Sequence, residues 1–198
     1  MADFLDLMVL RQSCRRFTDQ AVSESDLKTI LKAAQLAPIG SSRYDDIHLT
    51  VVQNRAILHE LTQALQERLK DRKTIEAIIG SVKASTAPRV QGQDPFYGAG
   101  TVIFVSHREQ TLQPGIEFSN VATVVLAMQL EATSLGLGSV FMWGVLEAMR
   151  VIPHLDNSHL LKLPTGFKPL LGLAVGYPAM EPRENSPDID RIGINYIS

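Results

Sequence analysis

The sequence holds a single cysteine, Cys14, among 198 residues. One thiol excludes an internal disulfide and a zinc site built from several cysteines, and it is typical of a reducing cytoplasm. An excess of charge is also missing, since 19 Lys and Arg stand against 21 Asp and Glu and the formal net charge is −2. Such a balance is not that of a protein that coats nucleic acid, so we expect no nucleic-acid partner.

Long hydrophobic runs are missing as well. The most apolar stretch, residues 121–128, is too short to cross a bilayer and is flanked by Asn120, Gln129 and Glu131. The first residues lack the basic-then-apolar order of a signal peptide, and no repeat, low-complexity tract or block of like charge occurs. With 45% hydrophobic and 20% charged residues, the sequence predicts one cytoplasmic domain over residues 1–198 without a membrane partner.

Hydrophobic periodicity predicts the secondary structure. Strands are expected at 47–52, 101–106, 138–142 and 167–176, and helices at 3–12, from an N-cap at Ser23 to Ala37, at 54–70, near 73–82, at 117–135 and at 145–152. Because the helices do not alternate strictly with the strands, the fold class is α+β, with one sheet and helices packed around it. Residues 83–98 are expected to form a long loop, and 177–198, with several prolines, an extended arm.

The helix at 117–135 is apolar around most of its circumference. Such a helix must be buried on all sides, so it either runs through the core or is covered by a second subunit.

Several common motifs are absent. Neither GxxxxGK[ST] nor HExxH occurs, and the five histidines show no zinc-like spacing. Residues 136–141 contain GLG, but they follow a helix and precede a strand, and Phe141 stands where a dinucleotide fingerprint has its third glycine. Gly136 is therefore interpreted as the C-cap of the preceding helix.

The clearest candidate site is a basic run at the end of the first predicted helix. If that turn stays helical, Arg11 and Arg15 share a face, and two guanidiniums with the Ser13 hydroxyl suit a phosphate or another polyanion. The alternative is that the arginines stay solvated at a helix C-terminus, where the helix dipole favours them. The same positive charge could lower the pKa of the Cys14 thiol.

A second candidate is the loop at 38–42, whose sequence is PIGSS. Its small residues would let a flat ligand approach backbone amides closely. The alternative is that it only connects a helix to a strand.

Four segments, in register along nearly the whole chain, resemble the nitroreductase family of flavin enzymes. They are RQSCRRF at 11–17, AQLAPIGSS at 34–42, LGLGS at 135–139 and LGLAVGYP at 171–178. The resemblance implies a central, mostly antiparallel sheet surrounded by helices, in an intertwined homodimer that exchanges C-terminal arms. It also implies FMN held non-covalently between subunits, which takes a hydride from NAD(P)H and reduces a nitroaromatic, a quinone or a similar small acceptor by a ping-pong route.

The resemblance also assigns contacts by position. Arg11 would meet the phosphate, Ser13 the ribityl chain or phosphate, and Arg15 the ribityl chain and pyrimidine edge. Ser41 and Ser42 would approach the flavin from the other subunit, and residues 141–144 would lie against the ring. The flavin performs the hydride step, so no catalytic side chain and no metal are expected. The full cofactor-binding set is Arg11, Gln12, Ser13, Arg15, Pro38, Ile39, Gly40, Ser41, Ser42, Phe141, Met142, Trp143, Gly144 and Arg183.

The chain departs from the family pattern at three places. Ser42 stands where the family often has Asn, residues 44–46 are Tyr-Asp-Asp where it often has Gln-Pro-Trp, and Asn185 replaces a second basic residue of the arm. Two alternatives to a reductase are a flavin-binding or flavin-scavenging protein without turnover, and a structural homologue that has lost the cofactor.

Overall fold

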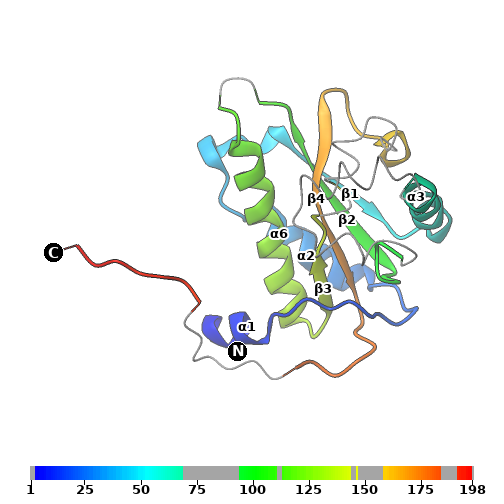
Figure 1. Ribbon diagram of the computed structural model, residues 1–198, viewed down its shortest axis with the longest axis horizontal. Helices are drawn as coiled ribbons and strands as arrows, with labels where there is room; N and C mark the ends of the chain where they lie inside the picture. The colour runs from blue at the N-terminus through cyan, green and yellow to red at the C-terminus, as the bar shows by residue number, and fades with distance from the viewer. Residues whose placement is uncertain are drawn as a thin grey trace.

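A four-stranded antiparallel sheet forms the centre of the fold (Figure 1). The computed structural model describes residues 3–68, 94–110, 113–143, 146, 158–183 and 191–197. In the order β1-β2-β4-β3, its strands are β1 (Ile47–Val52), β2 (Thr101–Arg108), β4 (Phe167–Gly176) and β3 (Gly138–Phe141). All four predicted strands are therefore confirmed, the second of them two residues longer and the third one residue shorter than expected.

Helices cover both faces of this sheet. They are α1 (Phe4–Leu10), α2 (Glu24–Gln35), α3 (Arg55–Arg68) and α6 (Ile116–Ser134), with short 3-10 turns at Gly40–Ser42, Tyr44–Asp46 and Ser158–Leu161. Alternate residues of β2 face opposite ways. Ile103 and Val105 pack with α2 and α6, whereas Val102 and Phe104 pack with α3. The α+β class is thus confirmed, as two layers of helix around one sheet.

Local signals set the ends of α2 and α6. The Ser23 side chain accepts a hydrogen bond from the Asp26 amide at 3.1 Å, which confirms the predicted N-cap. Just after the C-terminal end of α6, Gly136 has a φ of +73°. Its amide donates to Thr133 and the Leu137 amide donates to Ala132, which is the Schellman pattern. The interpretation of Gly136 as a C-cap is confirmed.

The circumference of α6 is covered differently from what its sequence suggests. Val121, Val124, Val125 and Met128 are fully or almost fully buried within a single chain, against the sheet and α2. Of the two ways in which the sequence allows this helix to be buried, packing within its own chain applies to these four residues, because β2 and β4 lie beneath one side of the helix and α2 beside it. What remains outward is a narrower stripe, of which Leu126 is 40% exposed. This α6 stripe consists of Ser119, Ala122, Leu126, Leu130 and Thr133.

Some expectations lie partly or wholly outside the described residues. These are the helix near 73–82, most of the loop at 83–98 and all but Leu146 of the helix at 145–152. Of the predicted arm, residues 191–197 extend away from the body (Figure 1), and Ile192, Ile194 and Tyr196 are largely exposed. Among the helices described, none has the length and apolar content needed to span a bilayer.

The orientation of α6 predicts opposite outcomes for two adjacent substitutions. Val125→Glu should prevent folding, because a carboxylate buried without a partner costs several kcal/mol, a large share of a typical stability of about 5–15 kcal/mol. Leu126→Glu places the same charge on the α6 stripe and should still fold. Thermal melts followed by circular dichroism distinguish the two, and a Val125→Glu chain that melts at the wild-type temperature would contradict this orientation.

Candidate functional site

The segment after α1 is held between two distant parts of the chain. The Cys14 amide donates to the Ser139 carbonyl at 2.9 Å, the Thr18 amide to Tyr177 at 2.9 Å and the Ala179 amide to Arg16 at 3.0 Å. Residues 11–18 therefore run beside the start of β3 and the end of β4 (Figure 1). These backbone bonds fix where the basic residues of the segment lie.

Arg183 is hydrogen-bonded to Gln12 of this segment, although the two residues are 171 positions apart in the sequence. The Gln12 side-chain amide donates to the Arg183 carbonyl at 3.3 Å, and its oxygen accepts from the Arg183 amide at 3.0 Å. The two bonds clamp the chain after β4 against the segment after α1. We call Arg11, Arg15 and Arg183, with Ser13, the basic cluster.

The basic cluster is not arranged on a helix. α1 ends at Leu10, and Arg11 follows with extended φ and ψ of −61° and 119°, so the turn does not stay helical and the condition for a helical face shared by Arg11 and Arg15 is not met. Over the ranges that the structure describes, no carboxylate forms an ion pair with the guanidinium of Arg11, Arg15 or Arg183. Positive charge without a carboxylate partner among the described residues favours an anionic ligand.

The Cys14 side chain packs against β3 and is hydrogen-bonded within its own segment. A Cβ added at Gly138 would lie 2.7 Å from Cys14 Sγ, and the thiol donates to the Arg16 carbonyl at 3.1 Å. Burial raises the pKa of Cys14, and this outweighs the lowering by the Arg16 hydrogen bond and the Arg15 charge. The hypothesis that neighbouring arginines lower this pKa was therefore wrong in its net direction.

The loop at 38–42 lies against the first half of α6. The Gly40 amide donates to Asn120 Oδ1 at 2.9 Å, and the Thr123 hydroxyl shares its hydrogen between the Asn120 carbonyl at 2.8 Å and the Pro38 carbonyl at 3.0 Å. Ser41 and Ser42 both have positive φ, 58° and 52°. This left-handed conformation costs about 1–2 kcal/mol for each such residue, so the surrounding bonds must hold it. Ile39 is buried, whereas both serines are exposed.

Two aromatic rings are exposed at the end of β3 and just after it. Phe141 and Trp143 are each more than one-third exposed, and the Trp143 ring lies 6.0 Å from that of Phe118 on α6. Met142, in contrast, is 3% exposed and its amide donates to Gly172 at 2.8 Å, so its side chain belongs to the core. Gly144 lies outside the described residues.

The structure does not bring all the predicted site residues together in one chain. The loop at 38–42 is bonded to Asn120 and Thr123, whereas the basic cluster adjoins Ser139, beyond the C-terminal end of α6. At 1.5 Å per residue, residues 120 and 134 of the helix are about 20 Å apart. The two groups therefore lie near opposite ends of α6.

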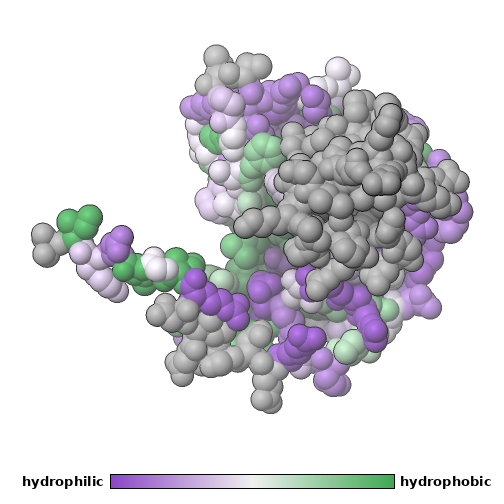
Figure 2. Space-filling view, in the orientation of Figure 1, coloured by the Kyte–Doolittle hydropathy of each residue, from purple (hydrophilic) through white to green (hydrophobic). Residues whose placement is uncertain are grey.

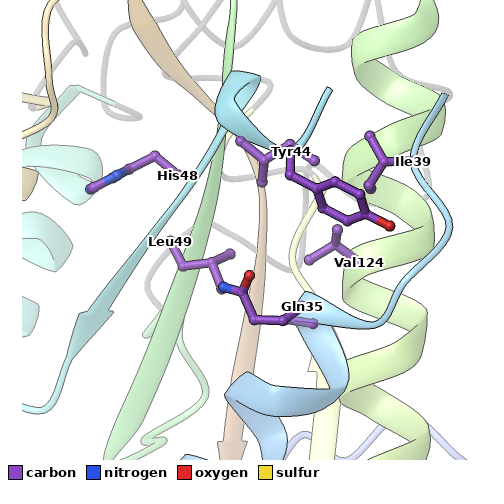
Figure 3. Close-up of a pocket in the computed structure, with 8 residues that line it drawn as sticks. Gln35, Ile39, Tyr44, His48, Leu49 and Val124 are labelled. Carbon is purple, nitrogen blue, oxygen red and sulfur yellow. The ribbon is translucent and has the colours of Figure 1, made fainter. Parts of the chain in front are cut away.

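A cavity of about 270 Å³ opens between the end of α2, the turn at Tyr44–Asp46 and β1 (Figure 3). Figure 3 shows Gln35, Ile39 and Val124 around the Tyr44 ring, while His48 lies apart from them. Its lining contains no Lys, Arg, Asp or Glu. The cavity is thus less suited to an anionic cofactor than the basic cluster, from which it is separate.

Two buried polar groups near the 38–42 loop were not found from the sequence. Asp46 is buried and pairs with Arg43 at 2.7 Å and Arg108 at 3.3 Å, and Asn120 contacts His107 within the core. Neither follows a recognisable motif. In the part of the chain that is described, no group of three or more His, Cys, Asp or Glu side chains could hold a metal ion.

Comparison with known proteins points to one family. The sequence profile of the nitroreductase family matches residues 9–177. A curated relative of Archaeoglobus fulgidus, named as an NADH dehydrogenase or NAD(P)H nitroreductase, is 34% identical over 64 residues, which cover 32% of this chain and only 36% of that protein.

Two solved structures share the whole fold. A nitroreductase of Bacteroides fragilis with bound FMN has a TM-score of 0.76 at 24% identity and covers 100% of both chains. A nitroreductase of Desulfitobacterium hafniense with bound FMN has a TM-score of 0.76 at 25% identity, with coverage of 99% of this chain and 100% of that one.

The raised pKa of Cys14 predicts slow alkylation. Because less of the thiol is ionised at neutral pH than in a free cysteine, iodoacetamide should modify the folded chain more slowly than the unfolded chain. The rate should climb only as the pH rises above the usual thiol range. Mass spectrometry of timed samples, with the chain in denaturant as the control, measures both rates; faster labelling of the folded chain at pH 7 would contradict the assignment.

Proposed function

Because the chain belongs to the nitroreductase family, we propose that it is an FMN-dependent oxidoreductase. In this proposal it takes electrons from NADH or NADPH and passes them to a nitroaromatic, a quinone or a similar small acceptor. The observation that carries the proposal is the basic cluster, in which arginines from both ends of the chain gather without a carboxylate partner among the described residues. The FMN named in the two similar structures supports the choice of cofactor.

The donors of the basic cluster fit the phosphate of FMN. Arg11 and Arg183 offer planar, permanently charged forks, and Ser13 adds a hydroxyl. The clamp between Gln12 and the Arg183 backbone holds the Arg183 main chain beside the residue that follows Arg11. We assign Arg11, Ser13 and Arg183 to the phosphate, with Gln12 as the group that positions Arg183.

Other residues would meet the remainder of the cofactor. Flavin supplies the hydride and electron transfer when it is bound, while the protein supplies position and charge. Arg15 would place a cation beside the ring, where it stabilises negative charge that develops there. The backbone at 141–144 would lie against the ring, and the exposed Phe141 and Trp143 would shield it from water.

We further propose that the working unit is a homodimer. The α6 stripe is apolar at its centre and open to solvent, and Figure 2 shows apolar surface along α6 between the C-terminal arm and the body. Two copies of α6 packed antiparallel about a two-fold axis would place the 38–42 loop of one subunit beside the basic cluster of its partner. The separation of the 38–42 loop from the basic cluster within one chain supports this arrangement. In the dimer, residues 177–198 would extend over the surface of the partner subunit.

The experiment that tests the oxidoreductase is an anaerobic absorbance scan. The purified chain should show flavin bands, release FMN on denaturation, and bleach with NADH or NADPH. A quinone or nitroaromatic should then restore the colour. Colour that neither nicotinamide bleaches would indicate a flavin-binding protein without turnover, and a colourless chain that takes up no FMN would indicate a homologue without the cofactor.

Substitution of the arginines tests the assignment of the basic cluster. Arg11→Ala should weaken FMN binding by about 1.5–3 kcal/mol, the scale of a hydrogen bond to a charged group. Arg15→Ala should also lower the reduction potential of the bound flavin, because it removes a cation from beside the reduced ring. Arg16→Ala is the matched control and should change little. Fluorescence titration and a dye-linked potential measure these effects; equal losses at Arg15 and Arg16 would contradict the register.

A further inference from the structure

A buried polar chain connects β2 to the loop at 38–42. Asn120 of α6 is 4% exposed and His107 of β2 is 1% exposed, so both lie in the core. Asn120 bonds the Gly40 amide at 2.9 Å and His107 Nε2 at 3.2 Å, and His107 Nδ1 bonds the Arg108 carbonyl at 2.7 Å. Buried polar groups are retained in such a core only when they are hydrogen-bonded.

The Gly40 amide at one end of this row of hydrogen bonds and the Arg108 carbonyl at the other end determine which atom donates in each bond. The Gly40 amide can only donate, so the side-chain oxygen of Asn120 faces it and the Asn120 NH₂ group faces His107. Since that NH₂ group can only donate, His107 Nε2 must accept. The Arg108 carbonyl can only accept, so His107 Nδ1 carries the hydrogen. One neutral tautomer of His107 therefore satisfies all three hydrogen bonds. If the Asn120 side-chain amide were flipped, its NH₂ group would face the Gly40 amide, and both groups are donors.

The loop at the Gly40 end of these hydrogen bonds has a strained backbone conformation. Gly40 directly precedes Ser41 and Ser42, two consecutive left-handed residues that are not glycine. The backbone at Gly40 approaches α6 so closely that a Cβ would lie 2.6 Å from Ile116 Cδ1. Asn120 thus anchors the loop at the point where the strained backbone begins, and Thr123, one turn on, holds Pro38.

We propose that Asn120 and His107 are positioning residues of the flavin site, which set the backbone conformation of Ser41 and Ser42 through the Gly40 amide. The inference rests on the proposed function, in which the two serines meet the cofactor. Neither Asn120 nor His107 touches the cofactor itself. Their effect is to present the serine hydroxyls and amides in one fixed arrangement, so that binding FMN does not have to order the loop.

Two pairs of variants test the network. Asn120→Ala removes both bonds, whereas Asn120→Asp keeps an acceptor for the Gly40 amide. His107→Leu removes the acceptor for Asn120, whereas His107→Gln keeps one in its side-chain oxygen. Val121→Ala is the matched control, because it removes buried volume from the next residue of α6 and lowers stability without removing a hydrogen bond to the loop.

Two measurements are made on each full-length variant. Amide hydrogen exchange of the peptide spanning 38–46, without cofactor, reports the order of the loop. Fluorescence titration reports the affinity for FMN. We expect Asn120→Ala and His107→Leu to speed exchange of this peptide and to weaken FMN binding about tenfold or more. His107→Gln and Val121→Ala should stay within about threefold of the wild type in affinity, whereas Asn120→Asp, which keeps the Gly40 bond but has no hydrogen to donate to His107 Nε2, should lose affinity as well.

The outcomes separate this inference from the proposed function. A wild-type chain that takes up no FMN overturns the proposed function and this inference with it. A wild type that binds FMN, with unchanged affinity and loop exchange in His107→Leu, overturns this inference alone. Equal loss of affinity in Val121→Ala and Asn120→Ala would also overturn it, because general destabilisation would then explain both. If Asn120→Ala does not fold, the Leu and Gln variants of His107 still decide the question.

Discussion

The packing of α6 against β2 and β4 is the constraint on which the other features of this chain depend. Burial of Val121, Val125 and Met128 against the sheet fixes the rotation of the helix about its axis. That rotation turns Asn120 toward His107 and the Gly40 amide, and it leaves Leu126 in the outward stripe. Three sides of α6 therefore have different roles: one packs in the core, one anchors the 38–42 loop, and one forms the proposed subunit interface.

Charge and strain are placed at opposite ends of this helix. Beyond its C-terminal end, the basic cluster concentrates positive charge that no described carboxylate neutralises, which favours an anionic ligand. Beside its first half, Ser41 and Ser42 adopt left-handed backbone that neighbouring bonds must sustain. Strained backbone of this kind is common at ligand sites, and it supports the assignment of the loop to the same proposed site as the cluster. A two-fold axis across the α6 stripe is the simplest way to unite them.

Local sequence patterns predicted most of the fold. β-branched and apolar runs located all four strands, and Ser23 and Gly136 marked helix ends through side-chain capping and left-handed backbone. What failed depended on long-range contacts. Periodicity showed that α6 is apolar on many sides but not that β2, β4 and α2 cover most of them. Likewise, charge near Cys14 was visible in the sequence, whereas the burial that raises its pKa was not.

The basic run after the first helix and the small-residue loop at 38–42 were visible as candidate sites in the sequence, and the family resemblance added Arg183 and residues 141–144 to them. Arg183 could be placed beside residues 11–15 by resemblance, but its clamp by Gln12 joins residues 171 positions apart. No motif marks Asn120 or His107, because the sequence shows that a polar residue lies in an apolar helix or strand but not which residue it contacts. Met142 lay within the predicted segment, yet the strand pleat turns its side chain into the core.

The central claim is that one flavin site is built from the basic cluster of one subunit and the 38–42 loop of the other. Complementation between two damaged chains tests it most directly. One chain carries Arg11→Ala and Arg15→Ala, and the other carries Ser41→Pro, which cannot adopt the positive φ of that position. Each chain bears its own affinity tag, and FMN binding is compared among both homodimers and the purified mixed dimer.

A shared site predicts that the mixed dimer regains one intact site, and so binds about one FMN per two chains with wild-type affinity while both homodimers bind weakly. A mixed dimer that binds FMN no better than either homodimer would show that cluster and loop act within a single chain, and would contradict the account.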